Sequence, residues 1–151
     1  MKKVFLWIKN IVIPLAVGGI VGFIISKFID YDTLNQPPLA PPGILFPIVW
    51  SILYFLMGVS YSILETNSLT DRKVDTIYYW QLIVNALWSI IFFVLKWRFV
   101  AILWILLLLA LVVYMIIVFY NKKKIAGLLQ LPYLLWVIFA TYLNIGVYLL
   151  N

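Results

Sequence analysis

The sequence predicts an all-α integral membrane bundle of five transmembrane helices, forming one domain over residues 1–151. Hydrophobic residues make up 66% of the chain, charged residues only 11%, and the mean hydropathy is +1.12. A soluble domain needs a far more charged surface. About 20 mostly apolar residues cross a bilayer core of roughly 30 Å. Five apolar runs of that length occur, and together they leave no room for a soluble domain.

The first apolar run, at 5–28, follows the basic residues Lys2 and Lys3 and in this respect resembles a signal peptide. It lacks a small-residue cleavage site and stays apolar to its end, which predicts a retained helix. Gly18, Gly22 and Ser26 recur at every fourth position along it. Such a series lets another helix approach closely, so we expect it to serve helix packing.

The loop at 29–43 is the longest connection, and it contains the segment Pro37-Pro38-Leu39-Ala40-Pro41-Pro42. Proline fixes φ and donates no N–H, so this segment predicts a semi-rigid lid and not a flexible linker. The other long connection, at 65–75, is polar. Asp75 is expected to cap the third helix, with Arg72 and Lys73 in water.

The second, third and fifth runs, at 44–64, 76–95 and 125–150, each carry one face that mixes aromatic rings with uncharged polar groups. Side chains four residues apart lie on the same side of a helix. The faces are Phe46, Trp50 and Tyr54 in the second run, Gln81, Asn85 and Ser89 in the third, and Trp136, Ala140 and Asn144 in the fifth, with Leu143 beside them. We therefore expect these three helices to line a common, uncharged cleft.

Prolines and the fourth run complete the element assignment. Pro47 lies in the first turn of its helix, where a missing N–H is harmless, whereas Pro132 is expected to kink the fifth helix and open space beside Trp136. The fourth run, at 99–120, is almost entirely aliphatic apart from Trp104 and Tyr114. We expect this helix to face lipid or a partner subunit.

Two interpretations compete for the aromatic and polar residues. Trp and Tyr favour membrane interfaces, and Asn or Ser can link neighbouring helices. This explains Trp97 near a segment end, but Trp50 and Trp136 lie further inside their helices and share a face with polar groups, which favours contact with a ligand. Asn85 lies near mid-span, where an unpaired amide is costly, and its partner is either protein or ligand.

The chain contains neither Cys nor His. This composition excludes disulfides, the usual zinc and non-haem iron sites, and Cys or His nucleophiles, so no metal site is expected. None of the five runs carries an ionisable residue near its middle. Proton pumps and charge-coupled transporters depend on such residues, so the sequence argues against both functions.

The net charge of +6 comes from basic residues at the ends of the apolar runs. That placement sets membrane orientation and does not indicate nucleic-acid binding. Lys27, Lys96 and Arg98 lie on one side of the membrane, and all other Lys and Arg residues lie on the side of the N-terminus. The excess of basic residues on the N-terminal side predicts a cytoplasmic N-terminus, with the C-terminus and the lid on the outer face.

Three motifs follow one another along nearly the whole chain. They are Pro37-Pro38-Leu39-Ala40-Pro41-Pro42 leading into Phe46-Pro47-Ile48-Val49-Trp50 and Leu53-Tyr54-Phe55-Leu56-Met57-Gly58; then Gln81-Leu82-Ile83-Val84-Asn85-Ala86-Leu87-Trp88-Ser89 with Phe92-Phe93; and finally Leu135-Trp136-Val137-Ile138-Phe139-Ala140-Thr141-Tyr142-Leu143-Asn144. In this order and at this separation they resemble the translocator protein family, also called TspO/MBR proteins, tryptophan-rich sensory proteins or peripheral benzodiazepine receptors.

The resemblance implies a five-helix bundle in a bacterial cell membrane, commonly a homodimer, with a pocket below the lid that takes porphyrins and benzodiazepine-type ligands. Carried over position by position, that pocket comprises Tyr31, Pro41, Phe46, Trp50, Tyr54, Asn85, Ser89, Trp136, Ala140 and Leu143. Bacterial members are associated with tetrapyrrole regulation and light-dependent porphyrin breakdown. The resemblance implicates Trp50 and Trp136 in that breakdown, which makes them the candidate catalytic residues.

We expect a membrane receptor for a flat tetrapyrrole, held by stacking on Trp50 and Trp136 and oriented by hydrogen bonds from Asn85 and Ser89. No cofactor is required. Because the strong axial ligands His and Cys are missing, a metal-free porphyrin is a more natural ligand than haem. Two alternatives stay open: light-driven degradation of the bound porphyrin with a Trp partner, and passive transport of an amphipathic small molecule such as a tetrapyrrole.

Overall fold

Long apolar helices dominate the computed structural model, which describes residues 2–28 and 31–151. The elements are α1 (Lys2–Ile25), the short turn η1 (Tyr31–Thr33), α2 (Leu45–Thr66), α3 (Arg72–Ser89), the π-helical turn η2 (Ile90–Val94), α4 (Arg98–Lys122), α5 (Lys124–Leu128) and α6 (Leu131–Leu150). Within the described residues, five stretches are long and apolar enough to cross a membrane. The predicted fold class, an all-α bundle with five candidate spans, is confirmed.

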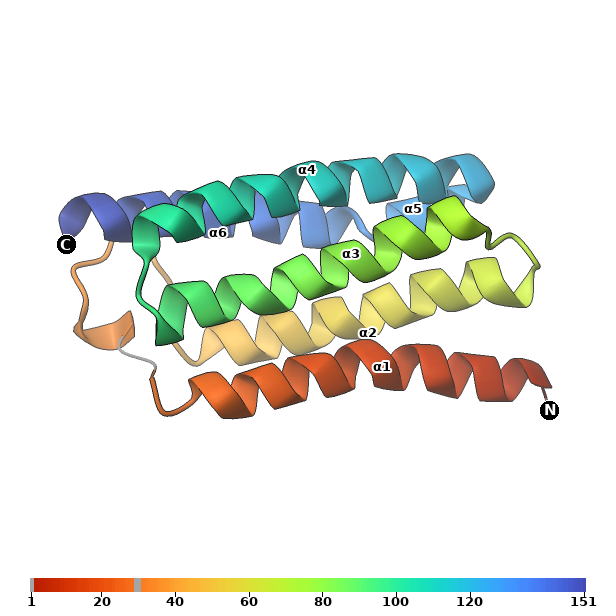
Figure 1. The fold of residues 1–151 in the computed structure, drawn as a ribbon, viewed down its shortest axis with the longest axis horizontal. Helices are drawn as coiled ribbons and strands as arrows, with labels where there is room; N and C mark the ends of the chain where they lie inside the picture. The colour runs from red at the N-terminus through yellow and green to blue at the C-terminus, as the bar shows by residue number, and fades with distance from the viewer. Residues whose placement is uncertain (1, 29–30) are drawn as a thin grey trace.

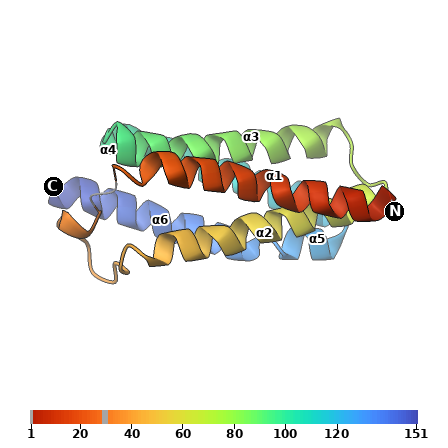
Figure 2. The same cartoon turned by 90° about the horizontal axis from the view of Figure 1, so that it is seen from below.

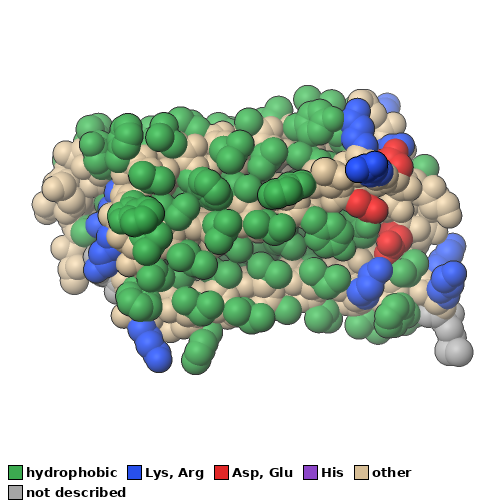
Figure 3. Space-filling model, in the orientation of Figure 1, with side chains coloured by type: hydrophobic (Ala, Val, Ile, Leu, Met, Phe, Trp, Pro, Cys, Tyr) green, Lys and Arg blue, Asp and Glu red, His purple; other side chains and the backbone are tan. Residues whose placement is uncertain are grey.

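The helices run roughly along one axis, with the N-terminus at one end of the bundle and the C-terminus at the other (Figure 1). Helix α1 packs along α2, while α4 packs along both α3 and α6. Seen from the α1 side, α1 lies in front of the bundle between α3 and α2 (Figure 2). On the face that Figure 3 shows, hydrophobic side chains cover the middle and charged side chains gather at the two ends. This distribution suits a bundle surrounded by lipid.

The lid lies above the C-terminal ends of α1 and α6. Positions 29 and 30 of the predicted loop 29–43 lie outside the described residues, and the rest of the loop follows from Tyr31 onward. The amide Nδ2 of Asn151 donates to the Asn35 carbonyl at 2.8 Å, and the Tyr142 hydroxyl donates to the Pro38 carbonyl. The loop is therefore attached to α6 at two points.

Helix α3 begins four positions before the predicted start at 76, and its cap is Asp71. The Asp71 carboxylate accepts a hydrogen bond from the Val74 N–H at 2.8 Å, which satisfies one of the free donors of the first turn. The expectation that Asp75 is the cap is wrong. Asp75 lies inside the first turn and accepts a hydrogen bond from the Tyr61 hydroxyl at 2.6 Å.

The last span is not one kinked helix but two helices, α5 and α6, with a break at Leu129 and Gln130. Pro132 has no N–H to donate to the carbonyl of Leu128, and its ring would clash with that carbonyl in a continuous helix. Pro132 instead lies in the first turn of α6, where the missing donor costs nothing. The predicted kink beside Trp136 is therefore wrong, because the chain resolves the conflict by ending one helix and starting another.

Helix α4 is partly an interior helix. Its buried side chains form one stripe facing α3 and α6: Ala101, Ile105, Leu108, Val112, Met115 and Phe119. The Trp104 indole also points inward and donates to the Val84 carbonyl at 2.8 Å. Only the opposite face, which includes Leu103 and Ile117, is exposed. The expectation that α4 serves lipid or a partner subunit applies to that outer face alone.

The close contact between α1 and α2 is made at Gly58 on α2. A Cβ added at Gly58 would lie 2.5 Å from the Asn10 carbonyl oxygen and 2.7 Å from the Ile11 Cα. The predicted packing series of α1 behaves differently, because a Cβ added at Gly22 would meet nothing within 4 Å. The small residues of α1 thus do not all serve close packing, and part of that face borders open space.

Candidate functional site

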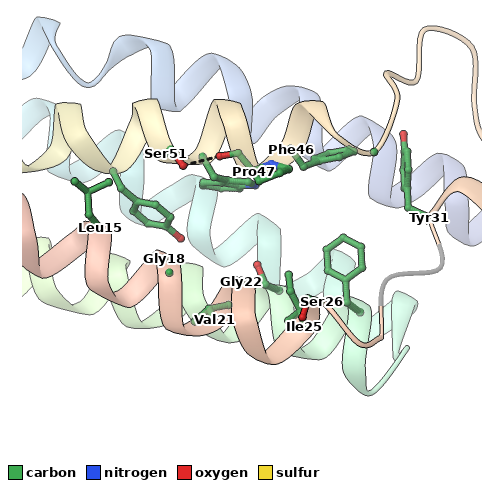
Figure 4. A pocket seen from close by; sticks show the side chains of 16 residues that line it. Leu15, Gly18, Val21, Gly22, Ile25, Ser26, Tyr31, Phe46, Pro47 and Ser51 are labelled. Carbon is green, nitrogen blue, oxygen red and sulfur yellow. Dashed lines mark hydrogen bonds between the residues drawn. The ribbon is translucent and has the colours of Figure 1, made fainter.

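A cavity of about 400 Å³ lies between α1 and α2, below the lid (Figure 4). Its size falls within the range of roughly 300–1,000 Å³ that is usual for small-molecule sites. None of its described lining residues is charged. These residues are Leu15, Gly18, Gly19, Val21, Gly22, Ile25, Ser26, Tyr31, Gly43, Phe46, Pro47, Trp50, Ser51, Tyr54, Ser89 and Phe93.

One wall of the cavity is aromatic and comes from α2. Phe46, Trp50 and Tyr54 recur every fourth residue, so one face of the helix presents all three rings to the cavity. The Trp50 and Tyr54 rings are stacked, with centroids 5.7 Å apart and planes at 29°. At the lid end, Tyr31 meets Phe46 edge to face at 4.9 Å. The rings form a nearly continuous apolar surface along the cavity.

The opposite wall comes from α1, where glycines alternate with the aliphatic side chains of Leu15, Val21 and Ile25. Added Cβ atoms at Gly19 and Gly22 would meet nothing within 4 Å. At Gly18 the space is already filled, because an added Cβ would lie 2.4 Å from the Tyr54 ring. The cavity is therefore a slot, with aromatic rings of α2 on one side and glycines and aliphatic side chains of α1 on the other.

Trp136 lies close to Trp50 but does not line the cavity. The two ring centroids are 6.4 Å apart and their planes are perpendicular, while the Trp136 ring also meets Phe46 at 5.7 Å. The Trp136 N–H is buried, and among the described residues it has no hydrogen-bond partner. The two indoles thus belong to one aromatic cluster, but only Trp50 faces the open space.

Asn85 is fully buried and bonded to protein groups. Its Oδ1 accepts a hydrogen bond from the Tyr54 hydroxyl at 2.8 Å, and its Nδ2 donates to the Tyr133 hydroxyl at 2.7 Å. The Tyr133 hydroxyl in turn donates to Gln81 Oε1 at 2.8 Å. The sequence left open whether Asn85 bonds to protein or to a ligand. In this structure its amide oxygen and nitrogen both bond to protein side chains. Asn85 holds Tyr54, which forms the cavity wall.

The remaining predicted residues are divided between two spaces. Ser89 lines the main cavity from the end of α3. Ala140 and Leu143 line a much smaller hollow of about 10 Å³, which shares Tyr31 and Phe46 with the main cavity. Pro41 lies in the lid and lines neither space.

Sequence reasoning missed the contribution of α1 and of Phe93. Val21, Ile25 and Ser26 line the slot together with the glycines. The signal was present in the series Gly18, Gly22 and Ser26, but small residues suit both helix contact and a cavity wall. Only the position of α2 decides between the two.

The described residues contain no group of three or more Asp, Glu, His or Cys side chains that could hold a metal ion. The polar side-chain groups of the lining residues are hydroxyls and the indole N–H of Trp50. Ser51 Oγ donates to the Pro47 carbonyl at 2.7 Å, and Ser26 Oγ donates to the Phe23 carbonyl at 2.7 Å. The site can bind a flat apolar molecule and offers a few uncharged polar contacts.

Comparison with known proteins gives one family. The model of the TspO/MBR family matches residues 10–150. The chain is 37% identical over 147 residues to the tryptophan-rich protein TspO of Archaeoglobus fulgidus, with 95% of each chain covered. It is 36% identical over 143 residues to protein CrtK of Rhodobacter capsulatus, covering 92% of this chain and 89% of that protein. The human translocator protein is 31% identical over 132 residues, which are 81% of this chain and 78% of that protein.

Proposed function

Since this chain belongs to the TspO/MBR family, we propose that it is a membrane receptor that binds porphyrin-type tetrapyrroles, and benzodiazepine-type ligands, in the slot between α1 and α2. It is an integral membrane protein with five candidate spans. For its orientation we propose a cytoplasmic N-terminus in a bacterial cell membrane, because most Lys and Arg residues lie at that end.

The observation that carries the proposal is the shape of the slot. A flat ring system can lie against Trp50 on one side and against the backbone of Gly22 on the other. Aromatic pairs contribute about 0.5–1.5 kcal/mol beyond the burial of their area. A ligand that covers Phe46 as well as Trp50 gains that contribution more than once, whereas a bulky, non-planar ligand of equal area does not.

Polar contacts are few and uncharged, and they suit a macrocycle with an apolar, metal-free face. The Ser89 hydroxyl lines the slot directly. Asn85 acts through Tyr54, whose ring it fixes by a hydrogen bond. Asn85 and Ser89 of the predicted site therefore have different roles in the proposal. Asn85 positions Tyr54, and Ser89 contacts the ligand. With no His or Cys in the chain, haem lacks its strong axial ligands.

A titration with protoporphyrin IX tests this proposal. Binding is followed by the Soret absorbance of the porphyrin, so that removal of an indole does not remove the signal. We expect Trp50→Leu to raise Kd about tenfold, equivalent to about 1.4 kcal/mol, because the largest stacking surface is lost. Trp80→Leu is the matched control, since Trp80 is exposed and does not line the slot. An unchanged Kd for protoporphyrin IX in Trp50→Leu would contradict the proposal.

A second candidate function is light-dependent degradation of the bound porphyrin. The observation in its favour is that Trp50 lines the slot and its ring centroid lies 6.4 Å from that of Trp136. The bound porphyrin absorbs light and activates dioxygen, which is the oxidant, and an oxidised Trp50 can then take an electron from the neighbouring Trp136 indole. We expect illuminated porphyrin to decay faster with protein than in detergent alone, and more slowly in Trp50→Phe and in Trp136→Phe. Equal decay in all samples would rule this activity out.

We also propose a homodimer, in line with the family resemblance. Gly19 and Gly22 border the slot and do not pack against a helix of the same chain. The outer face of α4, with Leu103 and Ile117 exposed, is then the stronger candidate interface. Small or aliphatic surfaces of this kind are what transmembrane helices use to associate.

A further inference from the structure

We propose that the ligand of the slot enters from the lipid bilayer through the gap between α1 and α2, because exposed residues of both helices line that side whereas the buried Tyr31 lies at the lid end. This inference rests on the proposed binding function of the slot. It adds an entry route, and with it a class of ligand, namely flat molecules that are already dissolved in the membrane.

The open side is formed by exposed residues on both helices. Gly19 and Gly22 on α1 and Pro47 and Ser51 on α2 line the slot and are all solvent-exposed in the isolated chain. These four positions lie inside the membrane-spanning helices. Figure 4 shows Gly22 on α1 opposite Pro47 and Ser51 on α2, with the cavity between them. In a bilayer the same opening faces lipid.

The rim of the gap is suited to lipid because its hydroxyls are already bonded within their own helices. Ser51 Oγ donates to the Pro47 carbonyl at 2.7 Å, and Ser26 Oγ donates to the Phe23 carbonyl at 2.7 Å. A hydroxyl that donates its proton to the preceding turn presents little unsatisfied polarity to hydrocarbon. The rim therefore lets an apolar ring pass without exposing an unpaired donor.

The lid end, in contrast, is closed by several contacts. Tyr31 is only 2% exposed and packs edge-on against Phe46. Gln36 Nε2 donates to the Tyr31 carbonyl at 2.7 Å. The lid is held on α6 by the hydrogen bonds between Asn35 and Asn151. A ligand arriving from water at the lid meets these contacts, whereas a ligand arriving between α1 and α2 does not.

The chemistry of the route restricts the ligand. Charged molecules are costly to place among the rim residues, and a water-soluble ligand gains no local concentration there. A flat tetrapyrrole or similar ring system partitions into lipid and diffuses in the plane of the membrane to the gap. The proline-rich lid then acts as a closed end wall of the slot.

A two-armed kinetic experiment tests the route. The chain contains no Cys, so Asn35→Cys with Asn151→Cys can be joined by a short bis-maleimide to lock the lid on α6. In the other arm, Gly22→Trp places a large ring in the gap. Ile20→Trp is its matched control, because Ile20 is exposed on the same helix and does not line the slot. Protoporphyrin IX dimethyl ester, which has no ionised carboxylate, is delivered from preloaded vesicles to protein in nanodiscs, and association is followed by Soret absorbance.

We expect Gly22→Trp to slow association by about tenfold, and both the locked lid and Ile20→Trp to leave the rate within about twofold of the wild-type rate. The route is overturned if the locked lid slows association while Gly22→Trp does not, if both slow it equally, or if neither does. Ser51→Trp, on the other side of the gap, carries the same expectation if Gly22→Trp fails to fold. Absence of saturable binding in the wild-type protein contradicts the proposed function itself, which separates the two failures.

Discussion

At the scale of single residues, the slot depends on a chain of buried hydrogen bonds behind its aromatic wall. Tyr54 is fixed at its ring by Gly18 and at its hydroxyl by Asn85, and Asn85 is fixed in turn by Tyr133. Trp50 stacks on Tyr54 and meets Tyr133 edge-on at 6.2 Å. The orientation of the Trp50 ring is therefore set in part by Asn85 and Tyr133, which do not line the slot.

Removing the Asn85 amide is expected to destabilise the protein. Asn85→Ala leaves the buried Tyr54 hydroxyl without its acceptor, at a cost of about 1–3 kcal/mol, whereas the Tyr133 hydroxyl loses one donor and keeps its bond to Gln81. Thermal unfolding in detergent measures the loss. Ser62→Ala is the matched control, because the Ser62 hydroxyl is buried and has no hydrogen-bond partner among the described residues, so its removal should cost little. Equal melting temperatures for Asn85→Ala and wild type would contradict the assigned network.

Asp71 gives a pH dependence at the end of the bundle. The hydrogen bond from Lys122, at 2.6 Å, and the capping bond from Val74 lower the pKa of the Asp71 carboxyl from its ordinary value of 3.8. A lowered folded-state pKa stabilises the protein above the unfolded-state pKa, and this contribution disappears as the pH falls through the folded-state value.

We therefore expect Asp71→Asn to melt at a lower temperature than wild type at pH 7, with the difference shrinking steadily below about pH 4. Melting curves of both proteins between pH 7 and pH 3 measure it. A difference that stays constant over that range would show that the charge of Asp71 does not contribute.

Residue patterns predicted the α2 wall but not the position of Trp136. Helical spacing alone places Phe46, Trp50 and Tyr54 on one face, so those three could be named from the sequence. Whether Trp136 faces the slot or lies behind Trp50 depends on the rotation of α6 relative to α2. The partner of Asn85 likewise comes from another helix, and no local pattern encodes it.

At the scale of elements, the slot exists because α1 and α2 touch tightly at one end and separate at the other. Gly58 on α2 brings the helices together beside Asn10, near the N-terminal end of α1. Towards the lid, Gly19 and Gly22 have no side chain, so space remains between α1 and the aromatic rings of α2. The small residue on α2 thus allows close helix contact, whereas the small residues on α1 leave space for the slot.

A matched pair of substitutions separates these roles. In Gly58→Ala the new methyl would lie 2.5 Å from the backbone oxygen of Asn10, which forces α1 away from α2 and costs about 1–3 kcal/mol. In Gly22→Ala the methyl meets open space. We expect a clear drop in melting temperature for Gly58→Ala and almost none for Gly22→Ala. The reverse order would contradict the assignment of close contact and open slot.

Element existence was predictable, while element ends were less so. The apolar runs identified all five spans because their composition differs so strongly from that of the connections. The start of α3 was misplaced because Asp71 and Asp75 are both suitable caps, and the choice depends on contacts with Lys122 and Tyr61 from other helices. The break between α5 and α6 follows from Pro132, but periodicity alone does not distinguish a break from a kink.

At the scale of the whole molecule, the two ends of the bundle differ. The N-terminal end carries most of the basic residues and the acidic residues that pair with them, such as Lys9 with Glu65 and Lys122 with Asp71. The other end carries the lid and the C-terminus (Figure 1). A slot that lies beneath the lid, and is closed there, suits a receptor better than a conduit across the membrane.

The proposed orientation is testable in intact cells. In a chain without native Cys, Asn67→Cys places a single thiol in the α2–α3 connection and Asn151→Cys places one at the C-terminus. Both positions are exposed and lie at opposite ends of the bundle. We expect a membrane-impermeant maleimide added outside to label Asn151→Cys only, and to label both variants after lysis. Labelling of Asn67→Cys in intact cells would reverse the orientation.

The position of a bound porphyrin is the most direct test of the central claim, that the slot between Trp50 and the glycines of α1 holds a flat ligand. The measurement is the electron density of protoporphyrin IX bound to the protein in a lipid environment. We expect a macrocycle between α1 and α2, with one face on the Trp50 indole and the other against the backbone of Gly22. A macrocycle bound elsewhere, such as in the open hollow beside Trp97 and Tyr148, with the slot empty of porphyrin, would contradict it.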